Sequence, residues 1–225
     1  KLRHGVMRTR GDLLFARAVV FFEGETEEQA LPILAEAYWG ANIHELGFTF
    51  VQVVGAGNYF PFIWLAERLN IRWYVFSDGE PQPVSLLDGA LRKVGVGKSA
   101  DCDNVVVIPN GRNFESQLVD EGYLPEIELA LNEAMNKDGF LDDYIDKMDG
   151  QPGKNRTTRD YSTAGGRERA ACDVMSEKKT RVAEPLASVL AEVEEEGRRF
   201  PAHIRTLFEK ISSDHGLAPA REGGK

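Results

Sequence analysis

The stretch FFEGETEEQALP, residues 21–32, leads from an apolar segment directly into four glutamates within six residues. The carboxylates of Glu23, Glu25, Glu27 and Glu28 repel one another, so folding alone does not favour such a cluster. Either the four side chains form the solvated first turn of a helix, or a positive group belongs among them. Choosing between these interpretations requires placing the cluster in the fold.

The first half of the chain alternates short apolar runs with amphipathic segments. Residues 16–22 (ARAVVFF) form a β-branched and aromatic run typical of a buried parallel strand. Comparable runs fill residues 48–54, 71–76 and 104–108. Helical patterns lie between the runs, and Thr26 with Gln29 predicts a capping box that opens the first helix. The alternation predicts an α/β fold, with a four-stranded, mainly parallel sheet flanked by helices.

After Glu115 only helical periodicity remains, over residues 124–148, 166–196 and 201–213. A polar, glycine-rich and basic connection, GQPGKNRTTRDYSTAGG, separates the first two of these segments. Long connections of this kind are often functional. We therefore predict a catalytic α/β domain, an all-helical subdomain and a disordered tail, over residues 10–122, 123–213 and 214–225.

The composition is that of an ordinary globular protein, with 42% hydrophobic and 28% charged residues among 225. No apolar run approaches the roughly 20 residues that a membrane-spanning helix needs, and no signal peptide is visible. Cys102 and Cys172 lie far apart without a metal-binding pattern, so we expect neither a disulfide nor a zinc site. These features predict a cytoplasmic protein without a membrane partner.

Charge is unevenly distributed along the chain. The formal net charge of −9 argues against general nucleic-acid binding, because affinity for phosphates usually rests on basic surface. Acids predominate from Arg112 to Asp149, but the following segment reverses the balance. This basic strip consists of Lys154, Arg156, Arg159, Arg167, Arg169, Lys178, Lys179 and Arg181. An acidic pocket beside a basic strip suits a metal-dependent enzyme acting on a polyanion, although two solvated helical faces explain the charges equally well.

Acidic residues follow three of the four predicted strands. Glu23 and Glu27 follow the first strand, Asp78 and Glu80 the third, and Asn113 and Glu115 the fourth. Because the carboxyl ends of parallel strands share one edge of a sheet, these side chains can converge there. Crowded carboxylates have raised pKa values unless cations neutralise them. Oxygen ligands of this kind suit Mg²⁺ or Mn²⁺, with Ca²⁺ as an inert substitute.

Some of these residues also have a structural interpretation. Glu25 and Glu28 fit a solvated first turn that complements the helix dipole. Asn113 is equally suited to cap a helix that begins there. Glu23 differs from the others, because a carboxylate that ends a buried strand and precedes Gly24 has little structural use.

The strand followed by EGxxE, and the later strand followed by DxE, resemble the pattern of TOPRIM domains, the Mg²⁺-binding modules of topoisomerases, primases and several nucleases. VVFFEGETEEQALPILAE and VGAGNYFPFIWLAERLNIRWYVFSDGE are more narrowly similar to the TOPRIM region of OLD-family (overcoming lysogenization defect) nucleases. The resemblance covers residues 10–120, and beyond them only a helical extension with a lysine can be matched. It implies an ABC-type ATPase domain earlier in the full-length chain, and oligomerisation through that domain.

The resemblance also implies an activity, a DNA endonuclease that hydrolyses phosphodiester bonds with two divalent cations, Mg²⁺ or Mn²⁺. The implied metal ligands are Glu23, Glu27, Asp78, Glu80, Asn113 and Glu115, with Glu80 in place of the second aspartate of the family's DxD motif. The catalytic lysine is implied to be Lys179 or Lys178, and the spacing KTxxA favours Lys179. DNA would be bound by Lys154, Arg156, Arg159, Arg167, Arg169 and Arg181.

Two other functions are compatible with the same residues. A Mg²⁺-dependent nucleotide phosphohydrolase would use similar acids without needing the basic strip beside them. A non-catalytic region that binds structural Mg²⁺ and regulates an ATPase would not need the strip either, and Glu80 in place of aspartate keeps this alternative open. No tyrosine follows the motifs as a nucleophile for strand passage, which favours hydrolysis by water.

Overall fold

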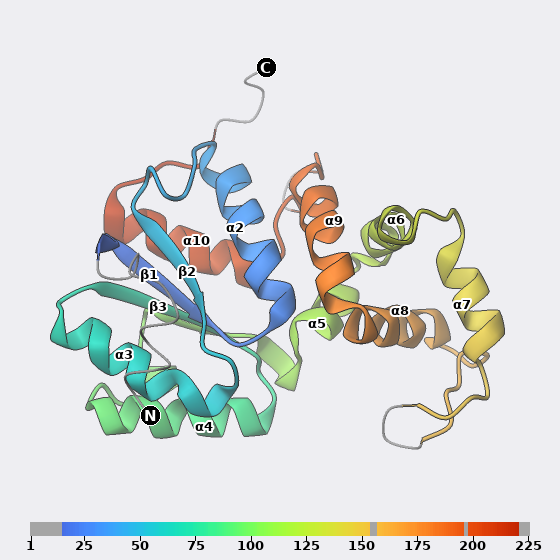
Figure 1. Ribbon diagram of the computed structural model, residues 1–225, viewed down its shortest axis with the longest axis horizontal. Helices are drawn as coiled ribbons and strands as arrows, with labels where there is room; N and C mark the ends of the chain where they lie inside the picture. The colour runs from blue at the N-terminus through green and yellow to red at the C-terminus, as the bar shows by residue number, and fades with distance from the viewer. Residues whose placement is uncertain (1–14, 154–156, 196–197, 221–225) are drawn as a thin grey trace.

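A four-stranded parallel sheet lies at the centre of the computed structural model, which describes residues 15–153, 157–195 and 198–220 (Figure 1). The strands are β1 (Ala18–Phe22), β2 (Phe48–Gln52), β3 (Arg72–Ser77) and β4 (Val105–Val107). Their order is β2-β1-β3-β4, and each neighbouring pair is parallel. The predicted α/β fold with a parallel sheet is confirmed, and the strand ends differ from the predicted ones by one or two residues.

Helices cover both faces of the sheet and continue beyond it. They are α2 (Glu25–Trp39), α3 (Tyr59–Arg68), α4 (Pro81–Val94), α5 (Phe114–Asp120), α6 (Leu124–Met135), α7 (Phe140–Met148), α8 (Gly166–Glu177), α9 (Lys179–Ala191) and α10 (Ala202–His215). α3 and α4 cover one face, and α2 and α10 cover the other. α6, α7 and α8 lie beside the sheet, and α9 packs against both α2 and α6 (Figure 1).

Successive side chains of each strand point to opposite faces of the sheet. Both faces are covered, so the apolar runs in the sequence are continuous. Val19 and Phe21 point into the core beneath α3 and α4, whereas Val20 and Phe22 point into the core shared with α2 and α10. Every residue of β1 is buried, because both faces of the sheet are covered. The second core continues without interruption into α6, α8 and α9, so the sheet and the helical region share one apolar interior.

Two of the predicted helices are divided in the structure. The pattern over residues 124–148 is split into α6 and α7, with Asn136 and Gly139 both in the left-handed conformation that ends helices. The pattern over residues 166–196 is broken at Lys178, whose ψ of 27° departs from the helical value. Apolar periodicity continues across both breaks, because the segments on either side pack into the same core.

Residue 214 is too early a start for the predicted disordered tail. α10 extends to His215, Asp214 forms an ion pair with Arg72 at 2.7 Å, and the backbone N–H of Ala220 donates to the carbonyl oxygen of Tyr38. Residues 221–225 lie outside the described part of the chain. The predicted boundary at residue 122 stays a prediction, although α9 and α10 beyond it pack on α2 and on the sheet.

Two further observations concern the cysteines and the apolar character of the helices. Cys102 and Cys172 are both unpaired and half-buried. Within the ranges that the structure describes, no helix combines the length and the apolar composition that crossing a membrane requires.

Candidate active site

The carboxyl edge of the sheet collects the acidic residues that follow β1, β3 and β4. Glu23 directly follows β1, Asp78 directly follows β3, and Glu115 lies in the first turn of α5. The carboxylate of Glu27 folds back over the end of β1, where a Cβ on Gly24 would collide with it. Glycine at this position therefore lets a helical carboxylate approach the strand end.

The loops after β3 and β4 are bound to each other at this edge. The backbone N–H of Phe114 donates to Oδ1 of Asp78 at 3.1 Å, and the N–H of Gly79 donates to the carbonyl oxygen of Arg112 at 2.8 Å. A Cβ on Gly79 would collide with the carbonyl oxygen of Ile108. The close approach fixes Asp78 beside the start of α5, which holds Glu115.

Burial and mutual repulsion dominate the electrostatics of this carboxylate cluster, which consists of Glu23, Glu27, Asp78 and Glu115. Glu27 and Glu115 have only 4% and 3% of their surface exposed. Burial, followed by the charges of Asp78 and Glu115, raises the pKa of Glu27 to about 8. Burial and the charge of Glu115 raise the pKa of Asp78 to about 7. Among the described residues, Oε2 of Glu23 is buried without a hydrogen-bond partner.

Lys179 enters the cluster from the first position of α9. Its Nζ lies 3.5 Å from Oε1 of Glu115, an oxygen that also accepts a hydrogen bond from Oγ1 of Thr26 at 3.0 Å. Burial disfavours the charged lysine, but Glu115 and Glu27 outweigh this effect, and the pKa of Lys179 is raised. Lys178, in contrast, is exposed. Of the two predicted lysines, Lys179 is the one that lies among the carboxylates.

Two other predicted ligands lie at the margin of the cluster. Glu80 is exposed at the N-cap position of α4, from which its charge contributes to the raised pKa of Asp78. Asn113 caps α5, and its Oδ1 accepts a hydrogen bond from the backbone N–H of Ser116 at 3.0 Å. The capping interpretation of Asn113 is confirmed, while metal binding by either residue stays a prediction. Glu25 is exposed in the first turn of α2.

The role of Thr26 was not foreseen from the sequence. The predicted capping box is wrong, because α2 begins at Glu25 with Gly24 at its N-cap and without a capping side chain. Thr26 is buried instead, and its hydroxyl donates a hydrogen bond to Glu115. The available signal was its position beside Glu27 in the first helical turn.

The arginines of the basic strip that the structure describes bind to the protein itself. Arg159 forms ion pairs with Glu177 and Asp173, and 9% of its side chain is exposed. Arg167 forms a bidentate pair with Glu128, with Nε 2.6 Å from Oε1. These contacts occupy much of the hydrogen-bonding capacity that a phosphate would require.

The remaining members of the strip differ in their surroundings. Arg169 donates to the carbonyl oxygens of Asp160 and Ala164, and Arg181 donates to that of Ala134. Lys154 and Arg156 lie outside the described residues. DNA binding by the strip stays a prediction.

A cavity of about 550 Å³ lies between α5, α8 and the connection before α8. Its lining includes Ser116, Cys172 and the arginines Arg112, Arg159 and Arg169. Burial, and then the charge of Glu115, raises the pKa of Cys172 to about 11. Ser116 in the lining directly follows Glu115 in α5, so arginines line a cavity next to the helix that holds Glu115.

The donor set is consistent in kind with a hard divalent cation. Within the described ranges, no three Asp, Glu, His or Cys side chains are arranged to hold a metal ion. The cluster nevertheless offers only carboxylate oxygens, which Mg²⁺ and Mn²⁺ prefer. The unpartnered oxygen of Glu23 and the raised pKa values of Glu27 and Asp78 indicate negative charge that the protein leaves uncompensated.

A family model matches part of the chain. Residues 14–79, which include Glu23, Glu27 and Asp78, match the family model described as overcoming lysogenization defect protein-like, TOPRIM domain. No curated protein matches the chain. The resemblance recognised in the sequence is confirmed for this segment.

Solved structures extend the likeness to the helical region. The C-terminal region of the Xanthomonas campestris pv. campestris OLD protein aligns with a TM-score of 0.61 at 20% identity, covering 90% of this chain and 97% of that one. The C-terminal region of the Burkholderia pseudomallei OLD protein aligns with a TM-score of 0.59 at 21% identity, covering 89% and 99%. The chain therefore has the fold of these C-terminal regions.

Proposed function

We propose, from the premise that residues 14–79 form an OLD-like TOPRIM domain, that this chain is a metal-dependent DNA endonuclease. The proposal rests above all on the position of Lys179, whose Nζ lies 3.5 Å from Glu115 within a cluster of buried carboxylates. Phosphodiester hydrolysis needs oxygen ligands for metal ions and a positive group for the charge that develops on the phosphate. Carboxylate oxygens and a lysine, the kinds of groups that these requirements call for, lie together at one edge of the sheet.

Two divalent cations, Mg²⁺ or Mn²⁺, would lower the pKa of a bound water and neutralise charge at the phosphate. Glu23, Asp78 and Glu80 are the residues that would hold one of them. Glu27, Asn113 and Glu115 would hold the other. The raised pKa values of Glu27 and Asp78 support cation binding at this edge, because bound cations would favour the charged carboxylates that burial and neighbouring acids disfavour. Ca²⁺ suits the same ligands as an inert substitute.

The surroundings of two tyrosines support water, rather than a side chain, as the attacking group. Tyr59 is fully buried, and its hydroxyl donates to the carbonyl oxygen of Phe76 at 3.3 Å. The hydroxyl of Tyr161 donates to Asp173 at 2.5 Å. Lys179 then acts on the phosphate by stabilising negative charge or by helping to protonate the leaving group.

DNA is the proposed substrate because basic groups extend beyond the carboxylate cluster. Lys178 is exposed next to Lys179, and Arg112 and Arg169 line the adjoining cavity. A small nucleotide would not need basic groups that extend beyond the carboxylate cluster. In this proposal the chain works in the cytoplasm as the nuclease region of a longer protein, beside an N-terminal ATPase domain through which the protein oligomerises.

The test is incubation with supercoiled plasmid in the presence of Mg²⁺, Mn²⁺ or Ca²⁺. We expect the parent protein to nick or linearise plasmid with Mg²⁺ or Mn²⁺ but not with Ca²⁺. Glu23→Ala and Lys179→Ala should abolish cleavage, and Lys179→Ala should still bind Mn²⁺ in a calorimetric titration. Glu25→Ala is the matched control, because Glu25 is exposed in the same turn as Glu27.

Each outcome distinguishes the alternatives. Cleavage that persists in Glu23→Ala and Lys179→Ala would come from another site or a contaminant. Intact plasmid in every sample would overturn a stand-alone nuclease and favour a regulatory region of an ATPase. Release of phosphate from nucleotides without plasmid cleavage would favour the phosphohydrolase.

A further inference from the structure

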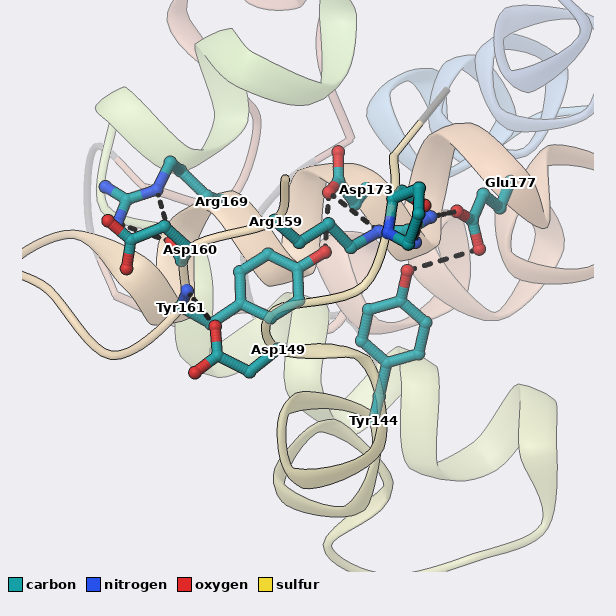
Figure 2. A network of polar contacts seen from close by, with 9 residues as sticks. Tyr144, Asp149, Arg159, Asp160, Tyr161, Arg169, Asp173 and Glu177 are labelled. Atoms are coloured by element: carbon teal, nitrogen blue, oxygen red, sulfur yellow. Dashed lines mark hydrogen bonds and ion pairs between the residues drawn. The ribbon is translucent and has the colours of Figure 1, made fainter. Parts of the chain in front are cut away.

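We propose that Arg159 is a positioning residue for Lys179, acting through Glu177, and not a contact to DNA. The inference rests on the proposed nuclease function and gives one member of the basic strip a different task within it. It follows from the polar network that joins α7, the connection before α8 and the last turn of α8 (Figure 2).

The guanidinium of Arg159 is directed into the protein. Its NH2 group donates to Oε1 of Glu177 at 2.5 Å, its NH1 group donates to the carbonyl oxygen of Pro152 at 2.7 Å, and its Nε lies 3.7 Å from Oδ2 of Asp173. With 9% of the side chain exposed, two of the three nitrogens donate to protein acceptors, and Nε is buried without a hydrogen-bond partner among the described residues. A phosphate would have to displace these contacts before it could use the planar fork of the arginine.

Two tyrosines complete the network from the other side (Figure 2). The hydroxyl of Tyr144, in α7, donates to Oε2 of Glu177 at 3.2 Å, and the hydroxyl of Tyr161 donates to Oδ2 of Asp173 at 2.5 Å. Asp173 and Glu177 therefore each form an ion pair with Arg159 and accept a hydrogen bond from a tyrosine. Arg159 and Tyr161, which precede α8, are thus bound to the helix through their side chains.

Without Arg159, the carboxylates of Asp173 and Glu177 would destabilise the end of α8. Asp173 and Glu177 lie one turn apart on α8, so their charges repel each other. Glu177 is also the last residue of the helix, where the helix dipole disfavours an acid. The arginine offsets both effects, and its removal is expected to loosen the last turn of α8.

That turn is adjacent to the lysine of the proposed active site. α8 ends at Glu177, Lys178 breaks the helix, and Lys179 is the first residue of α9. The backbone of Lys179 is thus held between a turn that Arg159 stabilises and a helix that packs on α2. A shift of this backbone would move Nζ away from Glu115 and from a phosphate bound there.

The experiment compares Arg159→Ala, Glu177→Ala and the control Glu168→Ala, an exposed acid in the first turn of the same helix. If Arg159 positions Lys179, Arg159→Ala and Glu177→Ala should each lower kcat for plasmid cleavage by about 10- to 100-fold, with KM unchanged, because small displacements of catalytic groups have effects of this size. The DNA dissociation constant and its salt dependence should be unchanged. Glu168→Ala should resemble the parent protein.

A DNA contact would give the opposite pattern for the two variants. Arg159→Ala would then raise KM and reduce the slope of log affinity against log salt by about 1. Glu177→Ala, which removes a negative charge, would leave kcat unchanged and strengthen DNA binding. This pattern would overturn the proposal.

Amide hydrogen exchange of residues 174–182 in DNA-free protein is a readout that does not need cleavage. Both variants should exchange faster than the parent there, and the control should not. If the parent proved inactive, the proposed nuclease function would fail, and faster exchange in both variants would still support the link from Arg159 to Lys179. Unchanged exchange would overturn that link whether or not the parent cleaves DNA.

Discussion

Two groups of polar side chains lie near opposite ends of β3, and the pKa values of their carboxylates are shifted in opposite directions. At the carboxyl end, the pKa of Asp78 is raised to about 7 and that of Glu27 to about 8, first by burial and then by neighbouring acids. At the amino end, burial alone would raise the pKa of Asp214. Hydrogen bonds from Arg72, Tyr74 and Lys210 outweigh burial and lower it to about 2.

The contrast distinguishes Asp214 and its partners, which stabilise the fold, from the carboxylate cluster, which does not. Asp214 accepts from Arg72 at 2.7 Å and from Tyr74 at 2.8 Å, and Lys210 lies 3.1 Å away, so its charge is compensated. The carboxylate cluster has Lys179 and Thr26 as partners of Glu115, while Oε2 of Glu23 has no partner among the described residues. Uncompensated buried acids weaken a fold, which is expected where they serve a ligand instead.

The largest expected effect is on activity at the carboxylate cluster. Lys179→Ala should lower the rate of plasmid cleavage by about 10²- to 10³-fold, the usual loss when a group that stabilises transition-state charge is removed. The midpoint of urea unfolding should change little. Lys210→Ala is the matched control, because this lysine pairs with Asp214 and should affect stability only. Equal losses of activity in both variants would contradict the view that the carboxylate cluster serves activity and that Asp214 and its partners serve stability.

Next in size is the stability that Asp214 contributes. Asp214→Ala should lower the free energy of unfolding by about 2 kcal/mol, since hydrogen bonds to charged groups contribute about 1.5–3 kcal/mol. Urea unfolding at pH 7 measures the change, and the cleavage rate per folded molecule should be retained. A variant as stable as the parent would show that the ion pairs of Asp214 only balance its burial.

The pH dependence of stability should differ between the two groups. Because folding raises the pKa of Glu27 from 4.5 to about 8, its contribution is present below pH 4.5 and is lost as the pH rises through 8 in metal-free protein. Because folding lowers the pKa of Asp214 from 3.8 to about 2, its contribution is present above pH 3.8 and is lost as the pH falls towards 2.

Urea unfolding in EDTA between pH 5 and pH 9 tests the expected loss of stability with rising pH that we attribute to Glu27. Glu27→Gln should flatten the loss of stability at high pH, because it removes the carboxyl group whose pKa is raised by folding. Addition of Mg²⁺ to the parent protein should flatten it as well. A slope that is the same in Glu27→Gln and in the parent would show that Glu27 is not the group responsible.

The smallest effect concerns a single neutral hydrogen-bond donor. Tyr74→Phe removes the hydroxyl that donates to Asp214 but keeps the buried ring, so it should lower the free energy of unfolding by about 1 kcal/mol. Thermal unfolding, compared with Asp214→Ala and with the double variant, measures how far the two changes are coupled. Full additivity would mean that the hydroxyl contributes nothing through Asp214.

The local pattern of the sequence predicted the strands well, because a strand buried on both faces is a continuous apolar run. It also placed Glu23, Asp78 and Glu115 at one edge, since the carboxyl ends of parallel strands meet there. It did not predict the helix breaks at Asn136 and Lys178, where apolar periodicity continues through the break. It assigned Thr26 to a cap, because the neighbouring sequence is that of a cap.

The basic strip shows the limit of arguments from charge. Arg159 and Arg167 are basic residues in a polar segment, and nothing local indicates that their partners are Glu177 and Glu128. These partners lie 18 and 39 positions away. Only the packing of α6, α7 and α8 brings such pairs within contact, so sequence alone could not separate a structural arginine from one free to bind phosphate.

By itself, the sequence determined the parallel sheet and the edge at which its acids gather, because both follow from short-range alternation and from strand direction. Tertiary structure decided which carboxylates are left uncompensated, and it brought to that edge Lys179, which the family resemblance had favoured over Lys178. Lys179 reaches Glu115, and Asp214 reaches Arg72, across distances in sequence that no local pattern encodes. The physical reason is that the pKa and the role of a charged group depend on which groups surround it and exclude water from it, and these come from elements that meet only in the folded chain.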